Sequence, residues 1–331
     1  MSDDSTYAAT PFDHPQADII LRSSDNIDFR VFKLFLSLAS PFFETLFDIP
    51  QPAGAQGSED QEIKDGLVVV PVTEDSKTLD ALLRFCYPCT LADDPKLEVL
   101  KDVMDVLEAA RKYSLDAIEK KARQVISNPK ILEAESLRCF AIAHRGHLRE
   151  ESLLAARYTL TQPLVPSWFQ EIELITAADL LSLLTYHRQC GDAVYALRLN
   201  LSWIKSHYGS SAACFWSPES YGNRGCACPR PVLTKYALFN MKPPQWWADC
   251  MDETFIALRD KPCKATVQAL LEKTVQNVKA GGCQGCAPKI ADGMRDLLDL
   301  FARKIEETVS QVNYISQRFL REPDDFLDRS S

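Results

Sequence analysis

Residues 17–47 read ADIILRSSDNIDFRVFKLFLSLASPFFETLF, and this stretch decides the fold of the N-terminal part of the chain. The apolar segment Asp18–Arg22 is typical of a short strand, and Ser23–Asn26 holds the small polar side chains of a turn. Asp28–Val31 predicts a second strand. Bulky apolar residues at spacings of three and four then predict two helices within residues 32–47. The expected order is strand, turn, strand, helix and helix.

Further strands and helices are expected up to residue 127. Residues 50–66 are rich in Pro, Gly and acidic side chains with hardly any apolar anchor, which predicts a mobile loop. The β-branched run at 67–72 predicts a strand. Amphipathic spacing predicts helices over 76–86, 97–113 and 115–127. This mixture of elements indicates an α+β domain.

Strand patterns nearly vanish beyond residue 130, and helical spacing takes their place. Breaks at glycine separate several of the predicted helices, for example 177–190 from 193–207. The last helix is expected to run from Ile290 to about Phe319. The sequence therefore predicts three parts: a flexible tail over 1–14, an α+β domain over 15–127 and an all-helical domain over 130–331 with a Cys-containing loop region.

The composition narrows the class of protein. A chain of 331 residues has room for two ordinary domains, and 46% apolar with 25% charged residues is typical of a soluble globular protein. The net charge of −9 argues against nucleic acid as a partner. No signal peptide opens the sequence, and no apolar run reaches the roughly 20 residues of a membrane helix. We therefore expect no membrane partner and a location in the cytoplasm or nucleus.

In its order of elements, the segment 17–126 resembles a BTB/POZ domain. The likeness rests on the Asp18–Leu21 strand, on the motif SPFF at Ser40–Phe43, and on LDALLRFCY at Leu79–Tyr87. The resemblance implies a module that binds proteins and performs no chemistry. It also implies a homodimer formed largely through the first helix and the neighbouring strands.

The helical region is similar to the C-terminal part of fungal, especially mushroom-type, BTB proteins of unknown role. This second likeness rests on five segments: Pro163–Leu164, 175–181, 186–190, the motif PQWW at 244–247, and the Cys-x-x-Cys before the last helix. It implies a lineage and no activity.

The BTB/POZ family has a charged pair in a pocket near the dimer interface, and the matching positions here are Asp18 and Lys33. The resemblance implies that their side chains pair. Two plainer interpretations stand beside it: Lys33 as a solvated helix charge, and Asp18 as a strand-edge carboxylate that accepts backbone N–H bonds. The sequence also departs from the family at Phe32, where a His is frequent.

A second departure bears on cullin scaffolds of ubiquitin ligases. Members that bind cullins usually carry a hydrophobic-x-Glu motif after the helix that matches residues 41–47. Here residues 48–52 read DIPQP, with no Glu at that distance. Cullin binding is therefore only weakly supported by the sequence.

Four cysteines form the strongest candidate for metal chemistry. Cys283 and Cys286 have the Cys-x-x-Cys spacing with which two thiolates grip one zinc ion, while Cys226 and Cys228 are closer together than is usual. Together they predict a structural zinc site, in which Cys214 or His207 could substitute for one ligand. The alternative is free thiols that pack as small apolar residues. Eleven cysteines, an odd number, argue against a complete disulfide framework.

Other patterns have plainer explanations. His144 and His147 lie on one helical face without a third ligand, which is more typical of an ordinary helix surface. The last helix has a heptad-like seam that suits either a coiled coil or packing within its own domain. Likewise, the tryptophans could anchor an interface or fill the core; they are Trp203, Trp216, Trp246 and Trp247.

No nucleophile elbow, phosphate loop or dinucleotide fingerprint is present in the sequence, so no enzyme activity is expected. The sequence favours a protein–protein interaction adaptor that dimerises through its N-terminal domain. Two alternatives stay open, a substrate adaptor of a cullin-type ubiquitin ligase and a nuclear transcriptional co-regulator.

Overall fold

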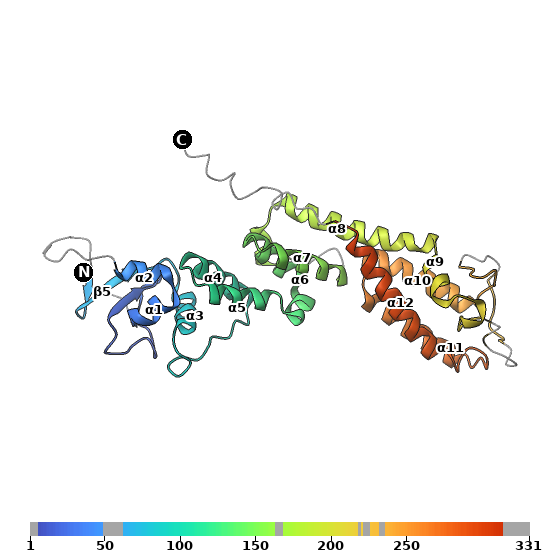
Figure 1. Cartoon of the computed structure of the whole chain (residues 1–331), viewed down its shortest axis with the longest axis horizontal. Coiled ribbons are helices and arrows are strands. Elements are labelled where there is room, and N and C mark those ends of the chain that lie inside the picture. The colour runs from blue at the N-terminus through green and yellow to red at the C-terminus, as the bar shows by residue number, and fades with distance from the viewer. Residues whose placement is uncertain are drawn as a thin grey trace. The chain divides into compact units, whose positions relative to one another are not determined.

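The computed structural model describes residues 6–48, 62–162, 168–217, 220, 226–231 and 236–313. The chain divides into two compact units, Met1–Glu151 and Ser152–Ser331, here called the N-terminal and C-terminal units. Strands and helices build the first unit, and the described part of the second is helical (Figure 1). The α+β class predicted from the sequence is confirmed.

The N-terminal unit is built on a five-stranded sheet with the order β1-β3-β2-β5-β4. β2 pairs antiparallel with β3 and parallel with β5, whereas β1 pairs parallel with β3. Asn26, in the left-handed conformation at φ 61°, closes the tight β2–β3 turn. The strands are β1 (Thr6–Tyr7), β2 (Ile19–Arg22), β3 (Ile27–Val31), β4 (Ile63–Lys64) and β5 (Leu67–Pro71).

Helices supply the remainder of the N-terminal core. They are α1 (Lys33–Ala39), α2 (Pro41–Asp48), α3 (Ser76–Cys86), α4 (Leu100–Lys112), α5 (Asp116–Ile126) and α6 (Pro129–Arg145). Asp75 caps α3 by accepting from the Thr78 N–H. The core includes Phe12, Leu21, Phe29, Val31, Leu36, Phe43, Leu79, Leu83, Val106 and Ile118.

Two parts of the predicted organisation differ from the structure. The sequence placed residues 1–14 in a flexible tail, but Thr6–Tyr7 forms β1 and Phe12 is completely buried. Backbone pairing and an aromatic anchor therefore hold residues 6–14 on the domain. In addition, α6 packs on α4 and α5, so the compact division falls after Glu151 and beyond the predicted boundary at 127–130. Most of the predicted loop at 50–66 lies outside the described residues, while β4 occupies Ile63–Lys64.

α7 (Arg149–Tyr158) spans the division, and the C-terminal unit continues with helices that pack along one another. α8 (Ala177–Ala196), α10 (Gln245–Asp260), α11 (Lys264–Ala280) and α12 (Ile290–Ser310) form its frame (Figure 1). α9 (Ser202–Tyr208) is shorter and contacts α12. Four short 3₁₀ turns complete the described elements: η1 (Thr159–Thr161), η2 (Gln170–Leu174), η3 (Leu197–Leu199) and η4 (Ser211–Ala213).

The apolar seam of the last helix faces the interior of its own unit. Of the described seam residues, Met294, Phe301 and Ile305 are buried, and Leu298, Thr308 and Val312 are half-buried. The Trp216 and Trp247 rings stack with centroids 3.7 Å apart inside the same unit, and both are buried. Packing within the unit is therefore the role of these residues. The seam positions beyond residue 313 lie outside the described chain.

Candidate functional site

An apolar surface on α1 and α2 is the first candidate site. α1 turns Leu36 into the core, and its opposite side carries Leu34 and Leu38, one helical turn apart and 63% and 78% exposed. Phe42, at the start of α2, is 40% exposed and lies edge-on to Phe43 and Tyr113. We call Leu34, Leu38 and Phe42 the α1 face. Exposed apolar side chains that gather on one surface are suited to protein binding.

The α1 face was not predicted from the sequence. The spacing of Phe32, Phe35 and Leu36 predicts only one packed side of this helix, and of these three residues Leu36 is the buried one. The signal was nevertheless present, because Leu34 and Leu38 are four residues apart and lie off that side.

Asp18 and Lys33 meet at the beginning of α1, but through the backbone. Asp18 Oδ1 accepts from the backbone N–H of Lys33 at 2.8 Å, which satisfies one of the unpaired amides of the first helical turn. The Lys33 ammonium lies 5.7 Å from the centre of the Phe47 ring. Among the described residues no ion pair joins the two side chains. The plainer interpretation of Asp18 is therefore the one observed, and the implied side-chain pairing is not.

Phe32, where the family often has His, is the residue just before α1. Its backbone N–H donates to the Tyr87 hydroxyl at 3.1 Å, and burial raises the pKa of Tyr87 to about 12. The Tyr87 hydroxyl therefore stays protonated near neutral pH. Tyr87 and Asp18 together fix the strand-to-helix connection before α1.

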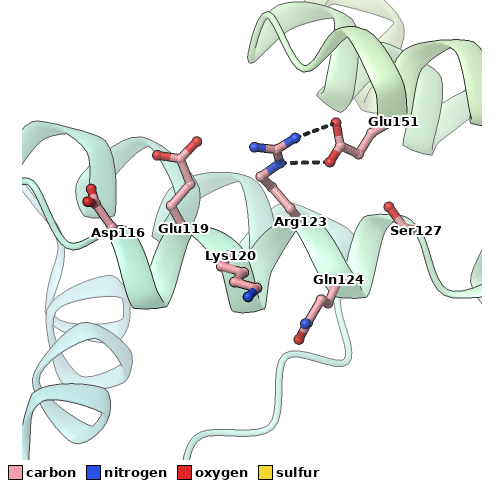
Figure 2. Close-up of a pocket in the computed structure, with 7 residues that line it drawn as sticks. All are labelled: Asp116, Glu119, Lys120, Arg123, Gln124, Ser127 and Glu151. Carbon is pink, nitrogen blue, oxygen red and sulfur yellow. Dashed lines mark hydrogen bonds and ion pairs between the residues drawn. The ribbon is translucent and has the colours of Figure 1, made fainter.

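A polar groove along α5 is the second candidate (Figure 2). Figure 2 shows Arg123 of α5 and Glu151 of α7 pointing toward one another, and two hydrogen bonds of 2.7 and 3.3 Å join them. Glu119 is bound by Arg111. The seven lining residues are Asp116, Glu119, Lys120, Arg123, Gln124, Ser127 and Glu151. Both glutamates of the groove are paired with arginines, so the groove offers paired charges as a binding surface.

The four cysteines predicted from the sequence converge in the C-terminal unit. Cys226 Sγ lies 3.4 Å from Cys286 Sγ and 3.9 Å from Cys283 Sγ, and Cys228 Sγ lies 3.7 Å from Cys286 Sγ. All four sulfur atoms are within 4.8 Å of one another. We call this group the cysteine cluster. Among the described residues it is the one group of three or more potential ligands close enough to share a metal ion.

The backbone around Cys283 favours a thiolate. Burial acts to raise its pKa, but backbone hydrogen bonds from Cys286, Ala227 and Gly285 outweigh burial and lower the pKa of Cys283 to about 6. Burial and hydrogen bonds with Cys283 and Cys286 raise the pKa of Cys228 instead. The pKa values of these two thiols therefore shift in opposite directions, and Cys283 ionises more readily than Cys228.

The other ligand candidates of the sequence lie elsewhere. His207 Nε2 is 3.1 Å from both carboxylate oxygens of Asp296, and Cys214 donates to the Ser210 carbonyl. His144 is buried and stacks on Phe140. Burial lowers the pKa of His187, which is a core side chain. None of these residues is part of the cysteine cluster.

The comparison with protein families adds the decisive observation for the N-terminal part. Residues 11–130 match the family model of the BTB/POZ domain. These residues form a BTB/POZ domain. The match begins before the predicted boundary at 15, in agreement with the buried Phe12, and it places the α1 face and Asp18 within the BTB/POZ domain.

A comparison with curated protein sequences finds no match. None of the helices in the described part of the chain is both long and apolar enough to cross a lipid bilayer. The family match therefore covers the BTB/POZ domain of residues 11–130. Because BTB/POZ domains are generally protein-interaction modules, protein binding is the function that this part of the chain supports.

Proposed function

We propose that this chain is a protein-interaction adaptor that forms a homodimer through the α1 face of its BTB/POZ domain. The observation that carries the proposal is the exposure of Leu34 and Leu38 on the first helix of a domain family that dimerises through that helix. A two-fold axis through α1 would bring the face against its own copy, so each exposed leucine could be buried by the same patch on the partner.

The C-terminal unit would then present a second surface to other proteins. It exposes Trp168 and Leu181 among its large apolar residues. Dimerisation would double that surface, which raises the avidity for a partner with two binding sites. We propose binding and no catalytic step.

The proposal predicts that Leu34→Asp/Leu38→Asp converts the dimer into a monomer. Burying two leucines contributes about 3 kcal/mol per protomer, so charged residues there should weaken the dimer at least about a hundredfold. Light scattering coupled to size exclusion, at micromolar protein, should give twice the chain mass for the wild type and the single mass for the variant.

Leu181→Asp on α8 is the matched control, because Leu181 is 65% exposed and lies outside the BTB/POZ domain. It should leave the dimer intact. A wild-type chain that stays monomeric at tens of micromolar would contradict homodimerisation itself. A double variant that remains dimeric would show that another surface forms the interface.

The narrower roles stay predictions from the sequence: a cullin-type ligase adaptor, a nuclear transcriptional co-regulator, the fungal lineage, and the cytoplasm or nucleus as location. The residues that bear on cullin binding begin at Asp48, the end of α2, and 49–61 lie outside the described residues. Capture of a cullin by the purified wild-type chain would assign the ligase role.

A further inference from the structure

We propose that the cysteine cluster is a structural zinc site, with Cys226, Cys228, Cys283 and Cys286 as its four thiolate ligands. The proposal concerns the C-terminal unit and is independent of dimerisation through the BTB/POZ domain. It rests on the sulfur geometry, on the backbone that surrounds it, and on the elements that it joins.

The sulfur atoms have the spacing of a tetrahedron around one ion. With zinc–sulfur bonds of about 2.3 Å, the edges of a tetrahedral site are about 3.8 Å long. Three of the six sulfur–sulfur separations are 3.4, 3.7 and 3.9 Å, close to this edge, and all six are within 4.8 Å. They are too long for a disulfide, whose bond is about 2.05 Å. An iron–sulfur cluster would hold the cysteines on different iron atoms and hence farther apart.

The surroundings favour a metal over four packed thiols. Cysteines that fill a core contact carbon atoms, whereas these four contact one another at the end of a helical unit, and only Cys286 is fully buried. Four thiolate ligands in a tetrahedral arrangement select zinc among common divalent ions of the cell. A bound cation would also balance the charge that the cluster carries when its thiols ionise.

The backbone is arranged as a ligand loop. The N–H groups of Cys286 and Gly285 on one segment, and of Ala227 on the other, hydrogen bond to the Cys283 sulfur. Such N–H···S bonds orient thiolate ligands in metal sites. Gly282, at φ 65°, adopts the left-handed conformation that lets the chain turn into the Cys283–Cys286 loop. Both cysteine pairs therefore contribute to one sulfur environment although 57 residues separate Cys226 from Cys283.

The metal would join the beginnings of two long helices. The Cys286 carbonyl accepts from the backbone N–H groups of Lys289 and Ile290, where α12 begins. On the other segment, the Pro229 carbonyl accepts from the Gln245 N–H at 2.8 Å, where α10 begins. Zinc at the cluster would thus cross-link the N-terminal ends of α10 and α12, and its binding free energy would add to the folding of the C-terminal unit.

The direct test is metal analysis of the full-length wild-type chain, purified and kept under reducing conditions and incubated with Zn²⁺ before removal of free metal. We expect one equivalent of zinc by elemental mass spectrometry. X-ray absorption should show four sulfur neighbours at about 2.3 Å. Zinc well below one equivalent, a shell containing nitrogen or oxygen ligands, or iron in place of zinc would overturn the proposal.

Variants assign the ligands. Cys283→Ser/Cys286→Ser should lose the bound zinc, while Cys89→Ser/Cys263→Ser should retain it, because neither of these two cysteines is in the cluster. If the first variant fails to fold, substitution of Co²⁺ into the wild type keeps the test decisive. A tetrahedral thiolate site gives intense visible bands and thiolate-to-cobalt charge transfer. A pale octahedral spectrum, or equal zinc loss in the control variant, would contradict the assignment.

Discussion

Asp28 is a fully buried carboxylate in the sheet of the BTB/POZ domain. Arg22 Nε lies 2.6 Å from its Oδ1, and Lys64 Nζ lies 2.8 Å from its Oδ2. The alternation of β3 predicts that Phe29 and Val31 share one face and that Asp28 lies on the other. The sequence does not show that Lys64, which is 36 residues after Asp28, pairs with Asp28 on its face of the sheet. Strand period is local information, whereas the partner of a buried charge comes from a distant strand.

Asp28→Ala should cost about 3 kcal/mol of unfolding free energy, because it leaves two partly buried cations without their shared carboxylate. Urea denaturation followed by circular dichroism measures the loss. Asp80→Ala is the matched control, since Asp80 pairs with Arg84 at the surface of α3 and its removal should cost less than about 1 kcal/mol. Equal losses of unfolding free energy in the two variants would show that the buried Asp28 pairs stabilise the domain no more than a surface pair does.

Among the elements, the C-terminal end of α8 was predicted wrongly, because glycine was taken as a helix break. The glycine at 191 predicted a break between two helices, but α8 continues from Ala177 to Ala196. A Cβ at Gly191 would lie 2.0 Å from the Arg259 carbonyl oxygen, so glycine is required by the close approach of α10. Glycine is a helix breaker and also the residue that lets two helices approach closely, and one sequence alone does not separate these roles.

Gly191→Ala should therefore destabilise the C-terminal unit by about 2 kcal/mol or more, because the obstacle is backbone that cannot rotate away. In an exposed helix position the same change would be stabilising. Thermal unfolding should show a lower melting temperature for this variant. Gln189→Ala, at an exposed position of the same helix, should have no comparable effect. A stable Gly191→Ala chain would mean that α8 and α10 can move apart at low cost.

For the whole molecule, the succession of an α+β unit and a helical unit was predictable, because periods of 2 and 3.6 can be read from short windows. The extent of the first unit was not. Phe12 stands in a polar segment, and α6 looks like any amphipathic helix, so their attachment to the BTB/POZ core depends on tertiary contacts. The convergence of the four cysteines was predicted from spacing, while the α1 face required knowledge of which apolar residues lie outside the core.

The two units have separate cores, so calorimetry of the intact chain should resolve two unfolding transitions. If the proposed zinc is bound at the cysteine cluster, a strong chelator should lower only the transition of the C-terminal unit, by on the order of 10 °C, since loss of that zinc would remove several kcal/mol from that unit alone. Leu34→Asp/Leu38→Asp with and without chelator serves as the control, because it changes the other unit. A single transition that moves as a whole would show that the units unfold together.

The position of β1 has a practical consequence for anyone who trims this chain to its BTB/POZ domain. A cut at residue 15 would delete the edge strand that covers β3 and would remove the Phe12 ring from its contacts with Phe29 and Tyr87, at centroid distances of 5.6 and 5.3 Å. The shortened fragment would expose a bare strand edge beside an internal hole, the combination that leads to aggregation during expression. A fragment that begins at or before Thr6 keeps both the edge strand β1 and the buried Phe12 ring.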